Sequence, residues 1–317
     1  MHHRPLDSNW GDYGAGDRSG RLNELTPERV VRAAAEIRTG RRFCLSLPLD
    51  YPGGNVLHPH RFPPERKVVD RGGAPAADFP LSRQRAGATG VVNDDIVTLY
   101  TQYSSQWDAF AHVGSHFDAD GDGVAEVIYY NGHYPGPDVD DLAKACIQGR
   151  GVMVDLHRRF GNARIDVDYA MLRSVMDEQG ATLEPGDILT LHTGYGQLLL
   201  DMQRRPDPDV IRSSCAALDA ADPALLNWIA ESDVSAIVAD NFAVETFPSK
   251  DRGPNTPFLP LHELCLFKLG IPLGELWYLT ELAAWLRDND RTRFFLTAPP
   301  LRLPGYVGSP ANAIATV

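Results

Sequence analysis

Residues 151–193 read GVMVDLHRRFGNARIDVDYAMLRSVMDEQGATLEPGDILTLHT, and this stretch contains an apolar strand, a helix and a second apolar strand. Residues 151–156 and 188–193 are short apolar runs, which are typical of strands buried on both faces of a sheet. Between them, residues 169–178 have the pattern of a helix that ends at Gly180. The alternation of strands with a helix predicts an α/β fold.

The same alternation extends along the chain in both directions. Upstream, Thr26 is a hydroxyl N-cap followed by proline and glutamate, which predicts a helix that Gly40 closes. Downstream, Asp222 caps a helix that runs to about residue 231. The other expected elements are strands at residues 43–47, 91–103, 234–239 and 294–297, and helices at residues 261–269 and 279–286. No shift in composition separates them, so we expect residues 1–317 to form a single domain.

Two segments depart from this regular pattern. Residues 1–24 are polar and rich in glycine, and we expect them to form an N-terminal arm lying on the body. Residues 48–90 are rich in proline, glycine and arginine, and predict a long irregular excursion. Loops of this length are uncommon and often carry function.

The composition excludes several classes of function. A formal net charge of −12 repels phosphate backbones and anionic lipids, so we expect no nucleic acid and no membrane partner. The four cysteines form no CxxC pair, and the first residues carry no apolar signal core, which together predict a cytoplasmic location. The chain also has no glycine-rich phosphate loop and no GxSxG motif, which argues against nucleotide binding and serine hydrolase chemistry.

The densest group of polar and aromatic residues is YSSQWDAFAHVGSHFDADGD at 103–122, directly after the apolar residues 91–103. Asp108 and His112 lie four residues apart, and His116 follows closely. Imidazole with carboxylate is the ligand set of zinc or manganese, and it also suits general-base activation of water. The alternative is that one or two of these histidines only satisfy buried hydrogen bonds.

Residues 118–123 also match the first half of a calcium-binding loop, with aspartates at the first, third and fifth positions and glycine at the sixth. The twelfth position requires a bidentate glutamate, and it is Tyr129 here. We therefore predict that residues 118–126 form a solvent-facing turn without a tightly held ion. The alternative is a calcium or magnesium site of another type, to which Glu126 at the ninth position contributes.

Other candidates are separated along the sequence. His262 and Glu275 lie thirteen residues apart and meet only if the chain turns back at Gly270. His192 ends an apolar strand, where sites gather in open α/β sheets, although a histidine there equally often serves the core. Glu245 has the same two interpretations.

These residues resemble a known family. The cyclase family of metal-dependent hydrolases, which includes kynurenine formamidase and isatin hydrolase, carries the signature H-x-G-T-H-x-D-A-P-x-H, with a later His and Glu completing a metal site. In one register, residues 105–112 match the second half of the signature, so Asp108 is the metal-binding aspartate and His112 the acid/base histidine. In the other register, residues 112–119 match its first half, and His116 becomes a ligand.

The first register agrees better with the rest of the chain. The longer branch of the family carries Q-W-D-x-x-x-H, then an acidic turn and Y-N-G, and residues 106–132 have these features in the same order. The resemblance continues through NELTPERVVRAA, GDILTLHTGYG and LHELCLFKLGIPLGE to the C-terminal FFLTAPPLRLPGYVGSPANAIA. It implies that His262 and Glu275 are the late metal ligands.

One departure concerns the two leading histidines, which become Gln102 and Gln106 in this register. An amide oxygen binds hard cations but is a poor zinc ligand. Three outcomes remain open: Gln106 is itself a ligand for a harder cation, His116 substitutes for a missing histidine, or metal binding is weakened.

The resemblance implies a single α/β domain of the swivelling β/β/α type, with a mixed sheet and flanking helices. It implies a hydrolase that binds manganese, zinc or magnesium, forms a homodimer or tetramer, and cleaves a C–N or C–O bond in a small cyclic amide, lactone or aryl amide. His112 is the expected acid/base, and the expected substrate-binding residues are Gln102, Trp107, Phe110, Tyr130 and His192. The alternatives are a lyase, dehydratase or cyclase of secondary metabolism, and a non-catalytic binding protein with a degenerate metal site.

Overall fold

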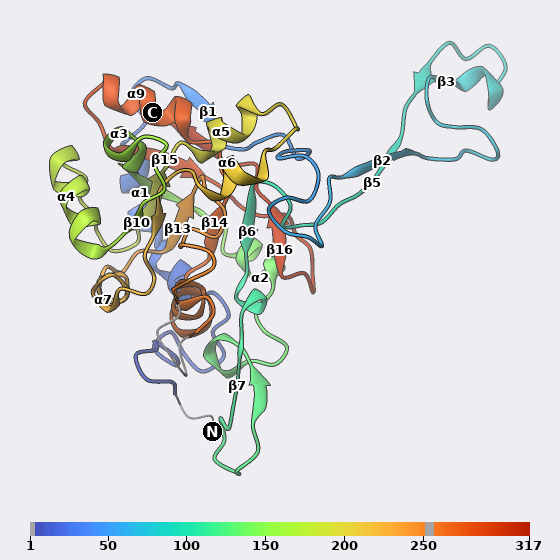
Figure 1. Cartoon of the computed structure of the whole chain (residues 1–317). Coiled ribbons are helices and arrows are strands. Elements are labelled where there is room, and N and C mark those ends of the chain that lie inside the picture. The colour runs from blue at the N-terminus through green and yellow to red at the C-terminus, as the bar shows by residue number, and fades with distance from the viewer. Residues whose placement is uncertain (1–3, 251–256) are drawn as a thin grey trace.

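The central feature of the fold is one nine-stranded mixed sheet, in a computed structural model that describes residues 4–250 and 257–317 (Figure 1). The strand order is β1-β17-β15-β9-β11-β13-β14-β6-β16. Strands β9, β11, β13 and β14 run parallel, and the pairs on either side are antiparallel. The strands are β1 (Arg42–Cys44), β6 (Gln106–Asp108), β9 (Gln148–Asp155), β11 (Ile188–His192), β13 (Ala236–Ala239), β14 (Leu273–Glu275), β15 (Arg293–Thr297), β16 (Gly308–Pro310) and β17 (Ile314–Thr316).

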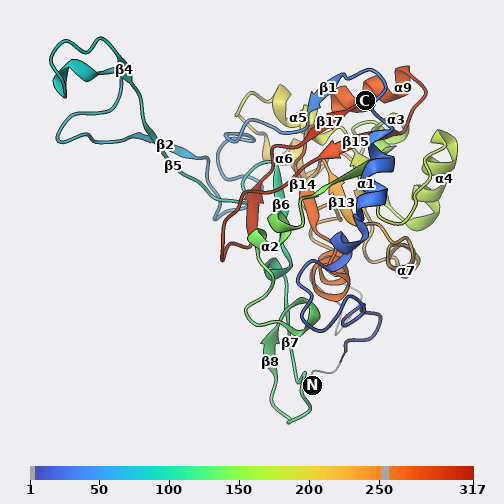
Figure 2. The ribbon, with the colours of Figure 1, turned by 180° about the vertical axis from the view of Figure 1, so that it is seen from behind.

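Helices flank this sheet, and α1 and α4 both contact β9 (Figure 2). They are α1 (Pro27–Ala34), α2 (Val139–Lys144), α3 (Leu156–Phe160), α4 (Tyr169–Gln179), α5 (Tyr195–Asp201), α6 (Pro208–Arg212), α7 (Pro223–Glu231), α8 (Pro260–His262) and α9 (Thr280–Asp288). A π-helical segment, η5 (Glu263–Leu269), continues α8. The shorter 3-10 turns are η1 (Gly20–Glu24), η2 (Leu81–Arg83), η3 (Phe110–His112) and η4 (Tyr130–Gly132). The expected single-domain α/β fold, with a large curled mixed sheet flanked by helices, is confirmed.

The central strands are buried on both faces, as their apolar sequences predict. Every residue of β11 and β13 is buried, and so are the last five residues of β9. Helix α4 follows the N-cap Asp168 and ends at Gly180, the predicted end, which adopts a left-handed conformation. The two strands and the helix that the sequence predicts in residues 151–193 are therefore present as β9, α4 and β11.

The excursion at residues 48–90 is part of a projecting arm rather than a structureless loop (Figure 1). A two-stranded ribbon of β2 (Glu65–Val68) and β5 (Asp95–Thr98) leads to a small pair of β3 (Phe79–Pro80) and β4 (Val91–Val92). The strand expected at residues 91–103 is therefore wrong as a buried support for the histidine segment, because all four residues of β5 are exposed. The buried strand β6 supplies that support instead.

Three further features complete the chain. The hairpin of β7 (Ser115–Phe117) and β8 (Glu126–Ile128) extends from the body, and β10 (Asp166–Val167) pairs with β12 (Ala217–Leu218) (Figure 1).

Near the N-terminus, the indole N–H of Trp10 donates a hydrogen bond to the backbone carbonyl of Phe267 at 2.9 Å, which attaches this segment to η5. No helix among the described residues has the length and apolar character that crossing a membrane requires.

Gly151 provides a test of packing in the central strand β9. A Cβ atom at this position would lie 2.3 Å from the ring of Phe294 on the neighbouring strand β15. Gly151→Ala is expected to lower the free energy of unfolding by about 1–3 kcal/mol, measured by urea denaturation. Gly16→Ala is the matched control, because nothing lies within 4 Å of its added Cβ. An equal effect of the two substitutions would contradict this account of the core.

Candidate metal centre

The pairing of β6 with β14 brings two carboxylates and an amide to one face of the sheet. In this antiparallel pair Glu275 lies opposite Gln106, and Leu273 lies opposite Asp108. Side chains of directly opposed residues point to the same face, and so do those of residues two apart on a strand. Gln106, Asp108 and Glu275 therefore share a face, and each is at most 2% exposed.

Helix α8 carries His262 to the same place, and Glu245 orients it. The Glu245 carboxylate accepts the backbone N–H groups of Leu261 and His262, each at 3.1 Å, and binds Nδ1 of His262 at 2.7 Å. This bond assigns the proton to Nδ1 and leaves Nε2 facing the carboxylates. A histidine that binds a metal usually donates its other ring N–H to a carboxylate in this way. Sequence reasoning left the role of Glu245 open, because no local pattern connects it with a histidine seventeen residues later.

The resulting donor group consists of Asp108, His262 and Glu275, whose ligand atoms lie within 4.8 Å of one another. His262 Nε2 is 3.2 Å from Glu275 Oε1 and 3.9 Å from Asp108 Oδ2. Ligands that each lie about 2.0–2.2 Å from one cation are separated by about 3–3.5 Å. The three residues that the sequence predicted as metal ligands thus converge. The separation of His262 and Glu275 lies in the range for a single divalent cation, and that of His262 and Asp108 is slightly longer.

The charge of this group also suits a cation. Asp108, Glu245 and Glu275 are buried, and no Lys or Arg among the described residues lies within ion-pair distance of them. Burial raises the pKa of Asp108, and the neighbouring Glu275 raises it further. Burial opposes a charge on His262, but its bonds to Glu245 and Glu275 outweigh that effect and raise its pKa to about 10. The site therefore attracts positive charge, and its donor chemistry fits a divalent metal ion.

Two glutamine amides hold the carboxylates of the donor group. The Gln106 amide donates to Glu275 Oε2 at 3.1 Å and to Asp108 Oδ1 at 3.4 Å, and the Gln102 amide also donates to Asp108 Oδ1. Each carboxylate thus has one oxygen bound to an amide and the other directed towards His262. The side-chain oxygen Oε1 of Gln106 is buried without a hydrogen-bond partner among the described residues, so the side-chain amide retains one free acceptor.

His112 lies beside the donor group, at the end of η3. Its ring centroid is 6.3 Å from that of His262, and the two rings are inclined at 64°. The ring is half-buried. Its charge lowers the pKa of the Asp108 carboxyl group and so opposes the effect of burial, as expected for a near neighbour. The structure therefore places the predicted acid/base histidine next to the three predicted ligands.

His116 is not part of this group. It is exposed on β7, where it pairs with Val127 in the projecting hairpin, so its substitution for a missing histidine has no geometric support. The acidic turn beyond it is exposed at residues 120–125. Ligand atoms of Asp118, Asp120 and Glu126 lie within 4.8 Å of one another, so the expected lack of a tightly held ion there stays a prediction. The Asp118 carboxylate accepts the backbone N–H groups of Gly121 and Gly123 at 2.7 and 2.8 Å, so this acid already stabilises the turn.

The aromatic residues expected at the substrate are packed in the core. Trp107 lies between Gln106 and Asp108 on β6, so its side chain points to the opposite face, where it packs edge-on against Trp277. Phe110 and Tyr130 pack together with ring centroids 5.1 Å apart, and both are at most 1% exposed. Their contact with substrate stays a prediction.

His192 belongs to a separate buried pair. Its Nδ1 bonds Asp155 at 2.8 Å across the β9–β11 register, and its Nε2 lies 3.3 Å from the Thr280 hydroxyl. Burial opposes a charge on His192, but the bond to Asp155 and the charge of Asp240 raise its pKa. Asp155 in turn has a lowered pKa, because these contacts outweigh its burial. The predicted contact of His192 with substrate is untested, whereas its bond to Asp155 joins two strands of the sheet.

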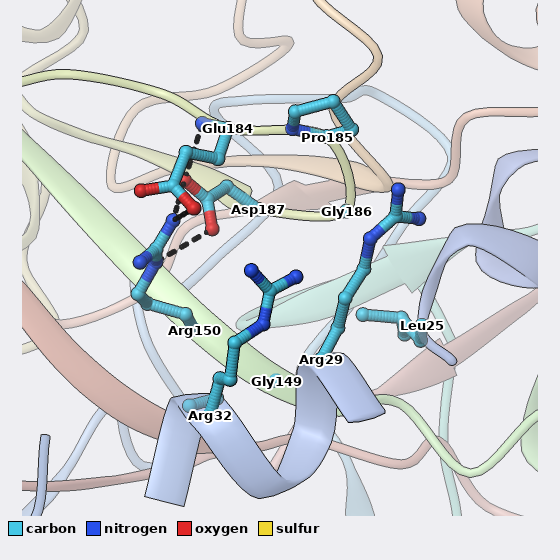
Figure 3. A pocket seen from close by; sticks show the side chains of 10 residues that line it. Leu25, Arg29, Arg32, Gly149, Arg150, Glu184, Pro185, Gly186 and Asp187 are labelled. Atoms are coloured by element: carbon cyan, nitrogen blue, oxygen red, sulfur yellow. Dashed lines mark hydrogen bonds and ion pairs between the residues drawn. The ribbon is translucent and has the colours of Figure 1, made fainter. Parts of the chain in front are cut away.

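A further hollow lies between α1 and the end of the loop before β11 (Figure 3). Arg150 on its wall pairs with Asp187 at 2.8 Å and with Glu184 at 3.0 Å. The cavity measures only about 20 Å³, which is about the space of one water molecule. Paired charges and small volume indicate a structural ion-pair group at this point.

The chain is an α/β protein with a curled mixed sheet and a buried group of histidine and carboxylates that could hold a cation. A family model described as "Putative cyclase" matches residues 45–246. A solved structure described as a novel cyclase is 30% identical, with a TM-score of 0.76 over 98% of this chain and 99% of that chain. The chain therefore belongs to the cyclase family.

Two more distant solved structures share the fold. The isatin hydrolases A from Labrenzia aggregata, bound to benzyl benzoate, and from Ralstonia solanacearum are each 15% identical with TM-scores of 0.58. The matches cover 93% and 92% of this chain, and 98% and 97% of those chains. A comparison with curated proteins gave no match.

The pair of His192 and Asp155 predicts a pH-dependent stability. The raised pKa of His192 stabilises the fold below its unfolded pKa of about 6.5, and this contribution is lost as pH rises through the folded value. The lowered pKa of Asp155 contributes above about 3.9 and is lost as pH falls through its folded value. Asp155→Asn is therefore expected to cost about 1.5–3 kcal/mol near pH 5.5 and less at pH 9, measured by urea denaturation.

Asn keeps the N-cap function of Asp155 at α3, so the substitution isolates its charge. Asp168→Asn is the matched control, since Asp168 also caps a helix, by accepting from Met171 N at 2.8 Å, without a histidine partner. A cost for Asp155→Asn that is the same at pH 5.5 and pH 9 would rule out the charged pair.

Proposed function

We propose that the protein is a metal-dependent hydrolase that cleaves a C–N or C–O bond in a small cyclic amide, lactone or aryl amide. The observation that carries this proposal is the convergence of Asp108, His262 and Glu275 in a buried group without a cationic partner among the described residues. Membership of the cyclase family and the shared fold of the isatin hydrolases support a hydrolytic reaction.

In this proposal each residue has a distinct role. Asp108, His262 and Glu275 hold the divalent cation, which when bound supplies a Lewis acid that lowers the pKa of water towards neutrality. Glu245 fixes the imidazole of His262, and Gln106 fixes the carboxylates. His112 takes a proton from water and returns one to the leaving group, since it lies beside the three ligands and an imidazole can serve as both base and acid.

The donor set bears on the choice of metal. Two carboxylates with one imidazole suit manganese, zinc and magnesium, and an amide oxygen from Gln106 adds a hard donor that favours manganese or magnesium. We also propose that the protein acts in the cytoplasm as a homodimer or tetramer. The rival proposal of a lyase, dehydratase or cyclase uses the same residues, and the rival of a non-catalytic binding protein requires that the site has lost its metal.

The first test combines metal binding with hydrolysis. Purified protein, stripped with chelator and reloaded with Mn²⁺, Zn²⁺ or Mg²⁺, is assayed by mass spectrometry for bound metal. Its turnover is then measured on isatin, dihydrocoumarin and formanilide in ¹⁸O-labelled water. We expect one cation per chain, hydrolysis of at least one compound class, and ¹⁸O in the product.

Asp108→Asn and Glu281→Gln form a matched pair for this assay. Asp108→Asn should lower metal affinity at least tenfold and abolish turnover, because it removes a charged ligand. Glu281 lies on α9, outside the donor group, so Glu281→Gln should change neither quantity. Metal binding of equal affinity in Asp108→Asn and the unmodified protein would overturn the proposal. Turnover without ¹⁸O incorporation would favour the lyase or cyclase.

His112→Asn separates proton transfer from metal binding. Removal of a general base costs about 10²–10⁴-fold in rate, so kcat should fall by this factor while the bound metal remains at one per chain. His116→Asn is the control and should retain both, because His116 lies exposed on the hairpin away from the donor group. Release of the metal by His112→Asn would make His112 a ligand instead of the acid/base. Unchanged turnover would remove it from the mechanism.

A further inference from the structure

A cavity of about 300 Å³ lies beyond the carboxyl end of β13, and it is linked to the donor group through residues next to the ligands. Asn241 lies on its wall, and the backbone carbonyl of Asn241 accepts the backbone N–H of Leu276, the residue directly after Glu275, at 3.0 Å. Val56 and Leu57 from the excursion also line the cavity. These two residues, together with the Asp108 partner Gln102, line a smaller hollow. The cavity and the donor group are therefore neighbouring parts of one region.

The wall of this cavity is mainly apolar and aromatic. The rings of Tyr195, Phe242 and Phe247 contribute to it, together with the aliphatic side chain of Ile211. Small-molecule sites have volumes of about 300–1,000 Å³ and combine apolar walls with a few polar groups. The size and lining fit a ligand with one or two flat rings.

Two hydrogen-bond donors on this wall have no partner among residues 4–250 and 257–317, and the side-chain oxygen of Asn241, an acceptor, is unpaired there as well. The guanidinium of Arg164 makes no hydrogen bond there, and no carboxylate lies within 4.0 Å of it. The hydroxyl of Tyr195, whose side chain is 4% exposed, likewise forms no hydrogen bond within this part of the chain. Burial raises the pKa of Tyr195, and the charge of nearby Arg164 opposes this shift. A permanent cation and a neutral O–H donor thus lie close together.

The chemistry of these two groups selects an anion. A guanidinium is planar, remains charged, and binds a carboxylate through two parallel hydrogen bonds. A phenol O–H donates a third hydrogen bond. An apolar wall around such donors strengthens a charged hydrogen bond, because the local dielectric is low. A neutral ring would fill the same volume but leave the guanidinium without a partner.

We infer that this cavity binds the carboxylate of an aromatic acid, with Arg164 pairing with the carboxylate and the Tyr195 hydroxyl donating to it. The substrate of the enzyme would then be an aromatic compound that carries an acidic group. This second statement rests on the proposed function, whereas the binding of an aromatic acid does not.

The test compares benzoate with benzamide, which have the same shape and differ in charge. Binding to metal-free protein, prepared with chelator, is measured by isothermal titration calorimetry, so that the carboxylate cannot bind a metal. We expect benzoate to bind at least tenfold more tightly than benzamide. Arg164→Gln should reduce this preference to less than threefold, and Tyr195→Phe should weaken benzoate binding about 2- to 10-fold.

Arg212→Gln and Arg173→Gln are the controls. Arg212 also lines the cavity, although its side chain is 72% exposed and lies 3.8 Å from Asp209, so its substitution should lower the preference less than Arg164→Gln does. Arg173→Gln, on α4 outside the cavity and paired with Asp177 at 2.7 Å, should leave the preference unchanged. Arg164→Lys covers the case in which Arg164→Gln does not fold, and it should retain part of the preference. Equal binding of benzoate and benzamide to the unmodified protein would overturn the inference, and so would an unchanged preference in Arg164→Gln. Neither result depends on a metal, so both are independent of the test of hydrolysis.

Discussion

Three buried carboxylates around one imidazole are the constraint on which the site depends. Asp108, Glu245 and Glu275 are at most 2% exposed, and no Lys or Arg in the described part of the chain neutralises them. An uncompensated charge in the interior costs several kcal/mol, so the fold needs protons or a cation at this point. Without a cation, protons fill that role, as the raised pKa values of Asp108 and His262 indicate. A bound metal would take the place of these protons, which couples the fold to the proposed chemistry.

The topology of the sheet makes this concentration of charge possible. Strand β14 is parallel to β13 on one side and antiparallel to β6 on the other. At this change of direction, the antiparallel register places Glu275 opposite Gln106, next to Asp108. Parallel strands alone would put their carboxyl ends in one row, whereas the reversed β6 brings a second polar segment to the same face. The apolar strands β9, β11 and β13 provide the rigid centre on which these two strands depend.

The sequence predicted those strands and helices that are determined by local features, namely apolar runs and capping residues. Apolar runs identified the central strands, and capping residues such as Thr26 and Asp222 located two of the helices. The error at residues 91–103 has a physical reason, since Ile96 and Val97 look like core residues but lie 47% and 57% exposed on the ribbon of the projecting arm. A run of β-branched residues specifies a strand without specifying what covers it. The fold class could therefore be predicted, and the arm could not.

The residues of the site could be predicted only where they lie close together in the sequence or match the signature of the family. Asp108 and His112 stand out by their spacing in the sequence. Their position beside His262 and Glu275 depends on the pairing of β6 with β14, and local sequence patterns do not predict which distant strands pair. The same limit applies to Glu245, which reaches His262 by accepting the first N–H groups of α8. Tyr195 lies in the stretch GDILTLHTGYG that carries the family resemblance, but no local pattern marks Tyr195 or Arg164 as a ligand-binding residue.

The glutamines at positions 102 and 106 give a physical reason why the donor group can function without further histidines. Each amide N–H binds one oxygen of a carboxylate and leaves the other oxygen directed at His262 Nε2. A histidine at either position would bring a soft nitrogen ligand, whereas an amide instead orients carboxylates that are already present. Loss of a ligand histidine therefore does not by itself imply loss of the metal. Compared with a site of three histidines, the group that remains is richer in oxygen, and oxygen donors favour manganese and magnesium over zinc.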